Sequence, residues 1–299
     1  MSMTPRFSIV ILTFARDPVL AETLARLREK VAARGDYEVL LVDNNPDRAD
    51  RERLLEGFAA TRYFWDGVNK GVSARNIGIA AAQGDIVIVL DDDVLVESSD
   101  PLAVFGALFD ADPRLGAVTI AKHVRGADTR RVDLIPHTRK DVDLDREFMT
   151  FRFVGGCVGF RTAAIRAVGG FSDQFFYGLE EIELSYRLIN AGWTIRYSPA
   201  VVVEELEHPS GRRPTRAVQT DRLVNKYIMS WLHMPFPHIL ANYLLFTPYI
   251  AYRVKGQVSI GTAIARFVRW LARSDRPRRN PLSPRAVAYI RDCGGALWR

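Results

Sequence analysis

The strand-like segment at residues 86–90 runs directly into three consecutive carboxylates, Asp91, Asp92 and Asp93. Its residues, Ile-Val-Ile-Val-Leu, are apolar, mostly β-branched and too few for a helix, which predicts a buried strand. Because burying three like charges is very costly, the carboxylates should lie at the strand's carboxyl end, in the crevice where open α/β sheets bind ligands. A divalent cation would relieve their repulsion. The alternative is a solvated acidic turn.

The segments around this strand predict an α/β fold. Strand-like apolar runs alternate with helix-forming stretches, and this order favours a mostly parallel sheet covered by helices on both faces, with right-handed crossovers. No glycine-rich dinucleotide fingerprint follows the first strand, which argues against a Rossmann dehydrogenase, and no Walker A pattern occurs. The predicted strands span residues 7–12, 37–42, 62–65, 86–90 and 151–160, and the predicted helices span residues 19–30, 47–60 and 72–82.

Composition indicates the compartment and excludes several classes of protein. Of the 299 residues, 48% are hydrophobic and 25% are charged, which is ordinary for a globular protein. The two cysteines, Cys157 and Cys293, are far apart and lack metal-ligand spacing, so we expect no disulfide and no zinc site, as in the reducing cytoplasm. No secretion signal is visible. The most apolar late stretch, residues 239–252, falls short of the roughly 20 residues that a transmembrane helix needs.

Several polar residues occupy positions from which they could contact a nucleotide. Thr13 and Arg16 follow the apolar run of the first strand, and Asp43 follows that of the second. A carboxylate at such a strand end can accept a hydrogen bond from a base or ribose, although helix capping is an alternative role. The glycine-bounded loop at Asn69 precedes a helix that carries Arg75 in its first turns, where amide donors and a guanidinium can meet phosphate.

Taken together, these motifs resemble the nucleotide-sugar half of family 2 glycosyltransferases, which have the GT-A fold. The resemblance rests on Asp43-Asn44, on the sequence Asn-Lys-Gly-Val-Ser-Ala-Arg-Asn-Ile-Gly-Ile at residues 69–79, and on residues 84–93. These segments match the family in order and spacing over about 50 residues.

The resemblance implies a role for each aspartate. The acidic cluster corresponds to the family's DXD motif, so Asp91 and Asp93 take its outer positions and face the ribose and the metal-bound diphosphate. Asp93 is then the direct metal ligand, Asp91 a further one, and Asp92 the middle residue near the sugar nucleotide. The resemblance also implies that Asp43 reads the base, that Arg75 helps to hold the nucleotide, and that the metal is Mg²⁺ or Mn²⁺.

Glu180 and Glu181 are the candidate catalytic acids. They open a predicted helix, whose positive end favours an ionised carboxylate, and a general base must be ionised to accept a proton. In the family this motif usually reads Glu-Asp with the second acid as the base, so the resemblance favours Glu181 while Glu180 stays the alternative. Glu183 precedes Arg187 by four residues, which predicts an intrahelical ion pair.

Two further segments predict loops that close over ligands. Residues 122–150 are polar with little periodicity, which is typical of a lid or acceptor loop and also of a variable insertion. His208 follows an acidic stretch; a surface loop residue is one interpretation, and the resemblance implies a secondary metal ligand instead. Arg212, Arg213 and Arg216 lie just beyond, where they could close over phosphates.

The C-terminal region, residues 216–299, predicts amphipathic helices with a basic tail. From residue 266 onward nine arginines oppose two aspartates, and this surplus of +7 accounts for the whole net charge of +6. Aromatic residues beside lysine and arginine suit a peripheral contact with a membrane. The alternatives are packing on the catalytic sheet or on a second subunit in a homodimer. Because no nucleic-acid-binding pattern is evident, we expect no nucleic-acid partner.

We therefore predict a GT-A catalytic domain over residues 1–215, with a nucleotide-sugar half (1–100) and an acceptor half (101–215), followed by the helical extension. The predicted activity is inverting, metal-assisted transfer of a sugar from a nucleotide diphosphate, UDP first and dTDP second, to a hydroxyl of a glycan, a lipid-linked acceptor or a small natural product. The predicted location is the cytoplasm or the inner face of its membrane. The alternative function is non-catalytic binding of a nucleotide sugar or glycan on the same fold.

Overall fold

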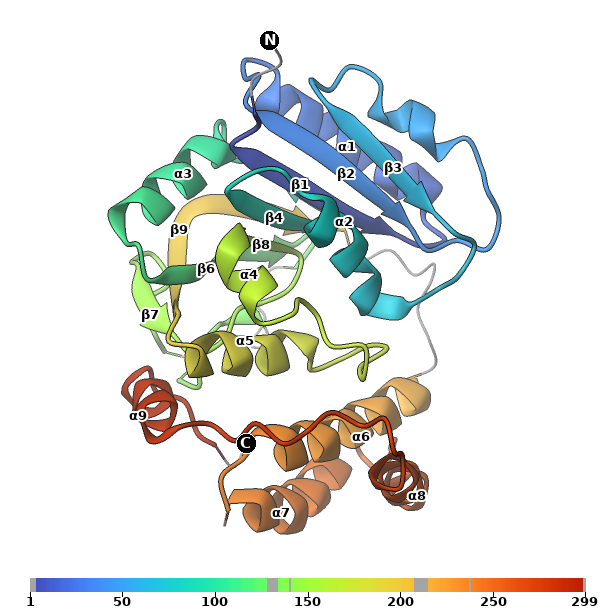
Figure 1. The fold of residues 1–299 in the computed structure, drawn as a ribbon, viewed down its shortest axis with the longest axis vertical. Coiled ribbons are helices and arrows are strands. Elements are labelled where there is room, and N and C mark those ends of the chain that lie inside the picture. Colours follow the sequence, from blue (N-terminus) through green and yellow to red (C-terminus); the bar gives the residue numbers. More distant parts are fainter. Residues whose placement is uncertain (1–3, 128–133, 140, 207–214, 237, 298–299) are drawn as a thin grey trace.

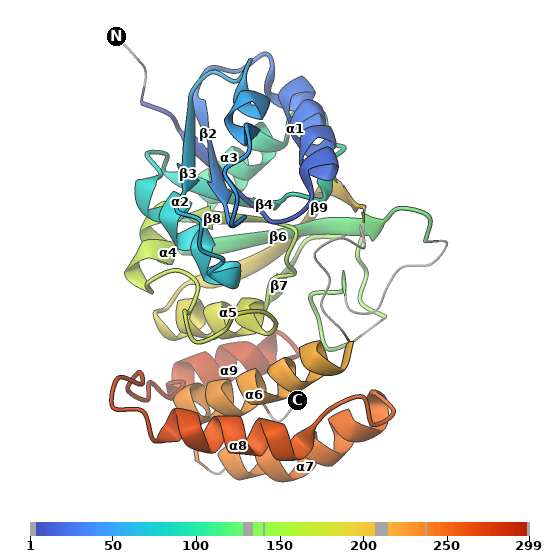
Figure 2. The ribbon, with the colours of Figure 1, turned by 90° about the vertical axis from the view of Figure 1, so that its right-hand side faces the viewer.

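A computed structural model describes residues 4–127, 134–139, 141–206, 215–236 and 238–297. Within these residues nine strands form one sheet in the order β3-β2-β1-β4-β8-β6-β9-β5, and β7 pairs with β9 outside this path. Figures 1 and 2 show helices on both faces of the sheet. The strands are β1 (Phe7–Thr13), β2 (Tyr37–Asp43), β3 (Thr61–Trp65), β4 (Ile86–Asp91), β5 (Val94–Val96), β6 (Leu115–Val124), β7 (Phe148–Thr150), β8 (Cys157–Arg161) and β9 (Thr194–Glu205).

The N-terminal half of the sheet is parallel, as predicted. Strand β1 lies between β2 and β4, and its residue Phe7 pairs with Tyr37 on one side and Ile86 on the other. Helix α1 (Asp17–Val31) packs its apolar side chains on one face, and helix α2 (Arg75–Ala81) covers the other. Burial on both faces explains why these strands are continuous runs of Val, Ile and Leu rather than alternating sequences.

The register of these strands brings their polar ends together. Thr13 at the end of β1 pairs with Asp43 at the end of β2, and the preceding residue, Leu12, pairs with Asp91 at the end of β4. The strand prediction and the position of the carboxylates at the sheet's carboxyl edge are therefore confirmed.

The second half of the sheet is mixed. Strand β8 runs antiparallel between β4 and β6, whereas β6 and β9 are parallel and β5 and β7 are antiparallel to β9. The strand expected over residues 151–160 begins only at Cys157, because residues 151–156 form an irregular segment that passes Gly156 at φ +105°. The α/β fold class is confirmed, with parallel pairing concentrated in the half that carries the aspartates.

Two helix predictions need correction. Residues 47–60 contain only the short 3₁₀ helix η1 (Arg51–Leu55), since Arg51 is held by Asp17 and Asp43 and since Gly57 at φ +88° leaves helical geometry. The helix predicted over residues 72–82 is divided into the 3₁₀ helix η2 (Gly71–Ala74) and α2.

The remaining helices belong to the second half and the C-terminal region. In Figures 1 and 2 the last four form a layer next to α5, on the side away from β1–β3. Apolar residues of α5, α6 and α8 belong to the same core cluster as residues of the sheet. None of the described helices is long and apolar enough to cross a membrane. These helices are α3 (Pro101–Ala111), α4 (Thr162–Ala167), α5 (Glu180–Asn190), α6 (Thr215–His233), α7 (His238–Arg253), α8 (Ile260–Leu271) and α9 (Pro284–Asp292).

Candidate active site

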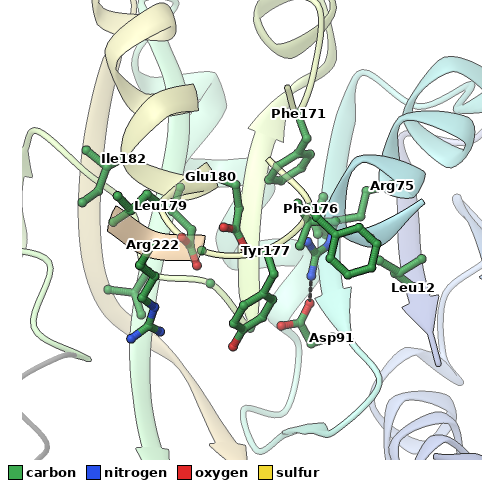
Figure 3. A pocket seen from close by; sticks show the side chains of 18 of the residues that line it. Leu12, Arg75, Asp91, Phe171, Phe176, Tyr177, Leu179, Glu180, Ile182 and Arg222 are labelled. Carbon is green, nitrogen blue, oxygen red and sulfur yellow. Dashed lines mark hydrogen bonds and ion pairs between the residues drawn. The ribbon is translucent and has the colours of Figure 1, made fainter. Parts of the chain in front are cut away.

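A pocket of about 1020 Å³ lies at the carboxyl edge of β1 and β4 and extends to α5, α6 and α7. In Figure 3, Glu180 lies between Asp91 and Arg75 on one side and Leu179, Ile182 and Arg222 on the other. The structure thus brings the two predicted acidic clusters, about 90 residues apart in the chain, into one cavity. The predicted site residues that line it are Arg16, Asn69, Arg75, Asp91, Asp92, Asp93, Glu180 and Glu181.

Asp92 is a buried carboxylate that fixes the end of β1. One of its oxygens accepts hydrogen bonds from the Thr13 hydroxyl at 2.9 Å and from the Phe14 amide at 3.2 Å. Its other oxygen accepts one from Arg16 at 3.2 Å. Burial nevertheless raises the pKa of Asp92, with Arg16 acting in the opposite direction. Thr13 does not line the pocket and reaches it only through Asp92.

The surroundings of Asp93 disfavour the charged form of its carboxylate. Arg16 donates to its carboxylate at 2.6 Å, but burial and the charge of Asp91 raise the pKa of Asp93 to about 7. Such a carboxylate gains stability from any nearby cation. A hard divalent cation therefore suits the oxygen donors of Asp91 and Asp93.

The protein donors for a cation are few. Among the residues that the structure describes, no group of three or more His, Cys, Asp or Glu side chains could hold a metal ion. Mg²⁺ commonly binds through one or two carboxylates and takes its remaining ligands from substrate phosphates and water. The donor set at Asp91 and Asp93 fits that mode of binding. His208, the predicted secondary ligand, lies outside the described residues, as do Arg212 and Arg213.

Arg75 provides the positive charge between the two acidic clusters. Its guanidinium donates to Asp91 at 2.5 Å and lies 5.3 Å from the ring centroid of Phe171 (Figure 3). Burial opposes its charge, yet Asp91 and then Glu180 more than offset burial and raise the pKa of Arg75. Arg75 is thus a permanent, half-buried cation in the lining of the pocket.

Asp43 is placed differently from the other candidates. It does not line the pocket, and each of its oxygens accepts two hydrogen bonds. The donors are the amide and side chain of Asn45 to one oxygen, and Arg51 and Tyr63 to the other. Its neighbour Asn44 does line the pocket and donates to the Gly71 carbonyl at 3.0 Å. In this conformation Asp43 shapes the loop after β2.

The turn before α5 places Glu180 and Glu181 at the helix N-terminus. Gly178 and Leu179 have φ of +89° and +70°, so Leu179 adopts the left-handed conformation that side chains rarely take. Gly155 gives Glu181 its space, because a Cβ there would lie only 2.7 Å from the Glu181 Oε1 atom. Irregular backbone of this kind, held against a charged pocket, is typical of functional sites.

The two glutamates differ in environment. Glu180 is buried, and its Oε2 atom has no hydrogen-bond partner among the described residues. Burial and the adjacent charge of Glu181 raise the pKa of Glu180 to about 8, against the attraction of Arg75. Glu181 is more exposed. Glu180 is therefore mostly protonated near pH 7.

Glu183 forms the ion pair that the sequence predicts. Its carboxylate accepts two hydrogen bonds from Arg187, at 2.8 and 2.7 Å, and lies 2.9 Å from His233 of α6. Burial acts to raise the pKa of Glu183, but His233 and Arg187 lower it overall. This cluster joins α5 to α6 and is structural rather than part of the pocket.

The structure adds pocket residues that the sequence analysis did not identify. Lys122 and Glu205 form an ion pair at 3.1 Å on one wall. Arg222 of α6 and Phe246 of α7 also line the pocket. No local motif marks these four residues, since only the pairing of β6 with β9 and the packing of α6 and α7 bring them to the site.

Comparisons with known proteins support the predicted family. The model of the family described as "Glycosyl transferase family 2" matches residues 8–169, more than half of the chain. An uncharacterized protein of Haemophilus influenzae is 32% identical over 171 residues, which cover 54% of this chain and 90% of that protein. The pre-mycofactocin glycosyltransferase of Mycobacterium tuberculosis is 30% identical over 147 residues, 44% of this chain and only 29% of that longer protein.

A third relative and two solved structures extend the likeness. The N-acetylglucosaminyl-diphospho-decaprenol L-rhamnosyltransferase of Mycobacterium tuberculosis is 26% identical, covering 71% of this chain and 80% of that protein. The mannosyltransferase PcManGT of Pyrobaculum calidifontis has a TM-score of 0.61 at 22% identity, covering 97% of this chain and 80% of that chain. For Staphylococcus aureus TarS the TM-score is 0.56 at 15% identity, covering 75% of this chain and 65% of that chain.

These likenesses confirm the predicted GT-A fold and the predicted enzyme class, a glycosyltransferase. The family match covers the strands and motifs on which the resemblance rested, from β1 to α4. The chain belongs to glycosyl transferase family 2.

Proposed function

We propose that this chain is an inverting glycosyltransferase that moves a sugar from a nucleotide diphosphate donor to an acceptor hydroxyl in a single displacement. The observation that carries the proposal is one pocket that contains the Asp91–Asp93 cluster, Arg75, and the glutamates at the N-terminus of α5. Such a pocket offers charge recognition for a diphosphate next to a candidate general base.

The donor occupies the charged part of this pocket. Asn69, Arg75 and Asp91 hold the nucleotide and its diphosphate, and the end of β1 is kept in place through Asp92. Asp43 is proposed to hydrogen-bond the base of the nucleotide, after some of its present hydrogen bonds within the protein have been broken. UDP is the first choice and dTDP the second. Structural neighbours have been solved with UDP-GlcNAc in one case and with GDP-Man and Mn²⁺ in another, which supports a nucleotide-sugar donor.

Asp93 and Asp91 would hold Mg²⁺ or Mn²⁺, with His208 as a further proposed ligand. When bound, such an ion neutralises negative charge that develops on the departing diphosphate. Arg16 already contacts Asp93, so this guanidinium would shift as the ion binds.

The reaction follows from the different burial of the two glutamates. Glu181 takes the proton from the acceptor hydroxyl, whose oxygen forms a bond to the anomeric carbon. The bond from that carbon to the diphosphate oxygen breaks, and the diphosphate leaves with the electron pair. One displacement from the opposite face inverts the configuration. Arg75 stabilises negative charge next to the reacting groups, while neutral Glu180 avoids a second buried charge.

The proposal assigns a separate role to each of three segments of the chain. Residues 1–100 contribute the donor site and residues 101–215 the acceptor side with the base. Residues 216–299 close the pocket and give a peripheral contact with the inner face of the cytoplasmic membrane. The tail's positive charge supports this contact because cytoplasmic leaflets are anionic.

Substitution of the two acidic clusters tests the proposal. Glu181→Gln should retain donor binding, measured by calorimetry with UDP-sugars and Mn²⁺, and should lose transfer by about 10²–10⁴-fold. Asp93→Ala should instead abolish metal-dependent binding and hydrolysis of the donor. Product configuration, read by NMR from the anomeric coupling, should be inverted. Full transfer activity in Glu181→Gln would remove Glu181 as the base, and a retained configuration would exclude the single displacement.

A further inference from the structure

Helix α7 exposes a continuous apolar face. Within residues 239–252 it has no charged side chain, and Leu244 and Tyr252 are 70% and 83% exposed. Leu240, Leu244 and Tyr252 recur at multiples of four residues and therefore lie along one side of the helix. Exposed apolar surface of this extent, with aromatic residues in it, is uncommon unless it contacts a partner or a membrane. The large exposed apolar residues on and just before α7 are Phe236, Leu240, Leu244, Leu245, Tyr249 and Tyr252.

The same helix also forms part of the pocket wall. Phe246 and Ile250 line the pocket. In the sequence of α7 they come directly after Leu245 and Tyr249, respectively. Because consecutive helical residues are about 100° apart, the apolar lining of the pocket continues around α7 onto its exposed face. A molecule with an aliphatic chain could therefore extend from the pocket along α7 without meeting a charged side chain of this helix.

The segment that contains α7 is rich in positive charge. Residues 222–274 include seven lysines and arginines and no aspartate or glutamate. Two of the seven, Arg266 and Arg273, pair with Asp221 and Asp275 just outside this segment. Arg253 and Lys255, at and just after the end of α7, form no ion pair with a carboxylate among the described residues. An apolar helix face bordered by cations is complementary to a bilayer with anionic head groups.

Arg222, an exposed residue of α6, supplies a further cation to the pocket lining. Arg16, Arg75 and Lys122 each have a carboxylate partner there. Arg222, in contrast, has no carboxylate partner in the part of the chain that the structure describes. In Figure 3 it lies on the side of Glu180 that is remote from Asp91, among apolar residues such as Leu179 and Ile182. An unpaired guanidinium among apolar side chains suits an anionic group attached to an aliphatic chain.

We propose that the acceptor is an anionic membrane lipid: α7 docks on an anionic bilayer, the lipid's chain lies along Phe246 and Ile250, and its anionic group binds Arg222 so that its hydroxyl reaches Glu181. This inference rests on the proposed glycosyl transfer and adds the substrate class and the surface that delivers it. A second copy of this chain and a free anionic sugar are the competing occupants, which the experiments below distinguish.

Flotation with vesicles tests the docking surface. The chain should float with phosphatidylglycerol vesicles and much less with phosphatidylcholine vesicles. Leu244→Glu/Leu245→Glu should weaken this binding at least about ten-fold, because it removes apolar contact and adds like charge to the lipid. Ala25→Glu/Ala33→Glu adds the same charge at exposed positions on and just after α1, in the other part of the molecule, and should float normally.

Two results of this experiment would overturn the docking proposal. One is the failure of the unmodified chain to float with anionic vesicles, or an equal loss in the two double variants. The other is a dimer in light scattering that becomes a monomer in Leu244→Glu/Leu245→Glu, since the face would then join two copies of the chain. Circular dichroism and melting curves establish that each variant is folded.

Binding of decyl phosphate below its micelle concentration tests the anion site. It should raise the melting temperature of the chain, while inorganic phosphate and decanol at equal concentration should raise it far less. Arg222→Gln should weaken decyl phosphate binding about ten-fold or more, and Arg269→Gln, on the exposed side of α8, should leave it unchanged. Equal binding by the two variants, or equal stabilisation by inorganic phosphate, would refute the lipid acceptor.

These experiments are independent of the catalytic assignment. Neither requires donor, metal or turnover, so neither depends on which residue is the catalytic base. If vesicles and decyl phosphate bind as expected while the Glu181 variant transfers sugar at the full rate, the proposed mechanism fails and the lipid site stands. If transfer is lost as expected but neither probe binds, only the lipid inference fails.

Discussion

Replacing Glu180 with glutamine removes a buried acid whose ionisation opposes folding. The Glu180 side chain is almost fully buried, with one oxygen that has no hydrogen-bond partner among the described residues. Burial and then the charge of Glu181 raise its pKa from an ordinary 4.5 to about 8. Glutamine has nearly the same shape and stays neutral at every pH, so it mimics the protonated acid.

The expected effect on stability follows from linkage. A group whose pKa is higher in the folded state contributes stability that is complete below its unfolded pKa and is lost as the pH rises through its folded pKa. The wild-type free energy of unfolding should therefore fall, relative to that of Glu180→Gln, between about pH 4.5 and pH 8. A rise from 4.5 to about 8 corresponds to at most roughly 5 kcal/mol.

Urea unfolding of both proteins at pH 5, 6, 7, 8 and 9, without donor or metal, measures this difference. Glu29→Gln, at an exposed position of α1, serves as the control and should follow the wild type at every pH. At pH 7 Glu180→Gln should also retain most of its transfer activity, since Glu181, the proposed base, is unchanged. Parallel stability curves for wild type and Glu180→Gln from pH 5 to 9 would refute the environment assigned to Glu180, and loss of transfer with normal stability would make Glu180 the base.

Two further substitutions test how the pocket is supported. Gly155→Ala should displace Glu181, whose Oε1 atom lies 2.7 Å from the added Cβ, and should therefore lower kcat about 10²-fold with little change in donor binding. Gly35→Ala is the matched control, because a Cβ at Gly35 has no atom within 4 Å. An unchanged kcat in Gly155→Ala would contradict the placement of Glu181. His233→Ala removes one of the partners of the buried Glu183 carboxylate and should lower the free energy of unfolding by about 3 kcal/mol. Urea unfolding measures this change. A change below about 1 kcal/mol would show that the cluster does not stabilise the contact between α5 and α6.

Local patterns were sufficient to predict the parallel, N-terminal part of the sheet. The apolar runs at residues 7–12, 37–42 and 86–90 form the expected parallel strands, because strands buried on both faces must be apolar throughout. The carboxylates after 86–90 lie at the expected edge, and Glu183 pairs with Arg187 as a helical spacing of four requires.

Predictions were weaker where tertiary contacts override local preference. The stretch at residues 47–60 has helical composition, but the ion pairs of Arg51 with Asp17 and Asp43 hold it in another conformation. The strand expected from residue 151 starts at Cys157, because the segment before it bends around Glu181. The position of β8 between β4 and β6 likewise could not be predicted, because the pattern of a single strand does not indicate which strands it pairs with.

The sequence by itself determined the family, the parallel strands and the two acidic clusters, since each is recorded in neighbouring residues as a run or a motif. Only the tertiary structure decided that Glu180 is buried beside Arg75 while Glu181 stays more exposed, and that Arg222 and Phe246 complete the same pocket. The reason is physical: the burial of a carboxyl and the lining of a pocket depend on residues far away in the chain, and only folding brings these together.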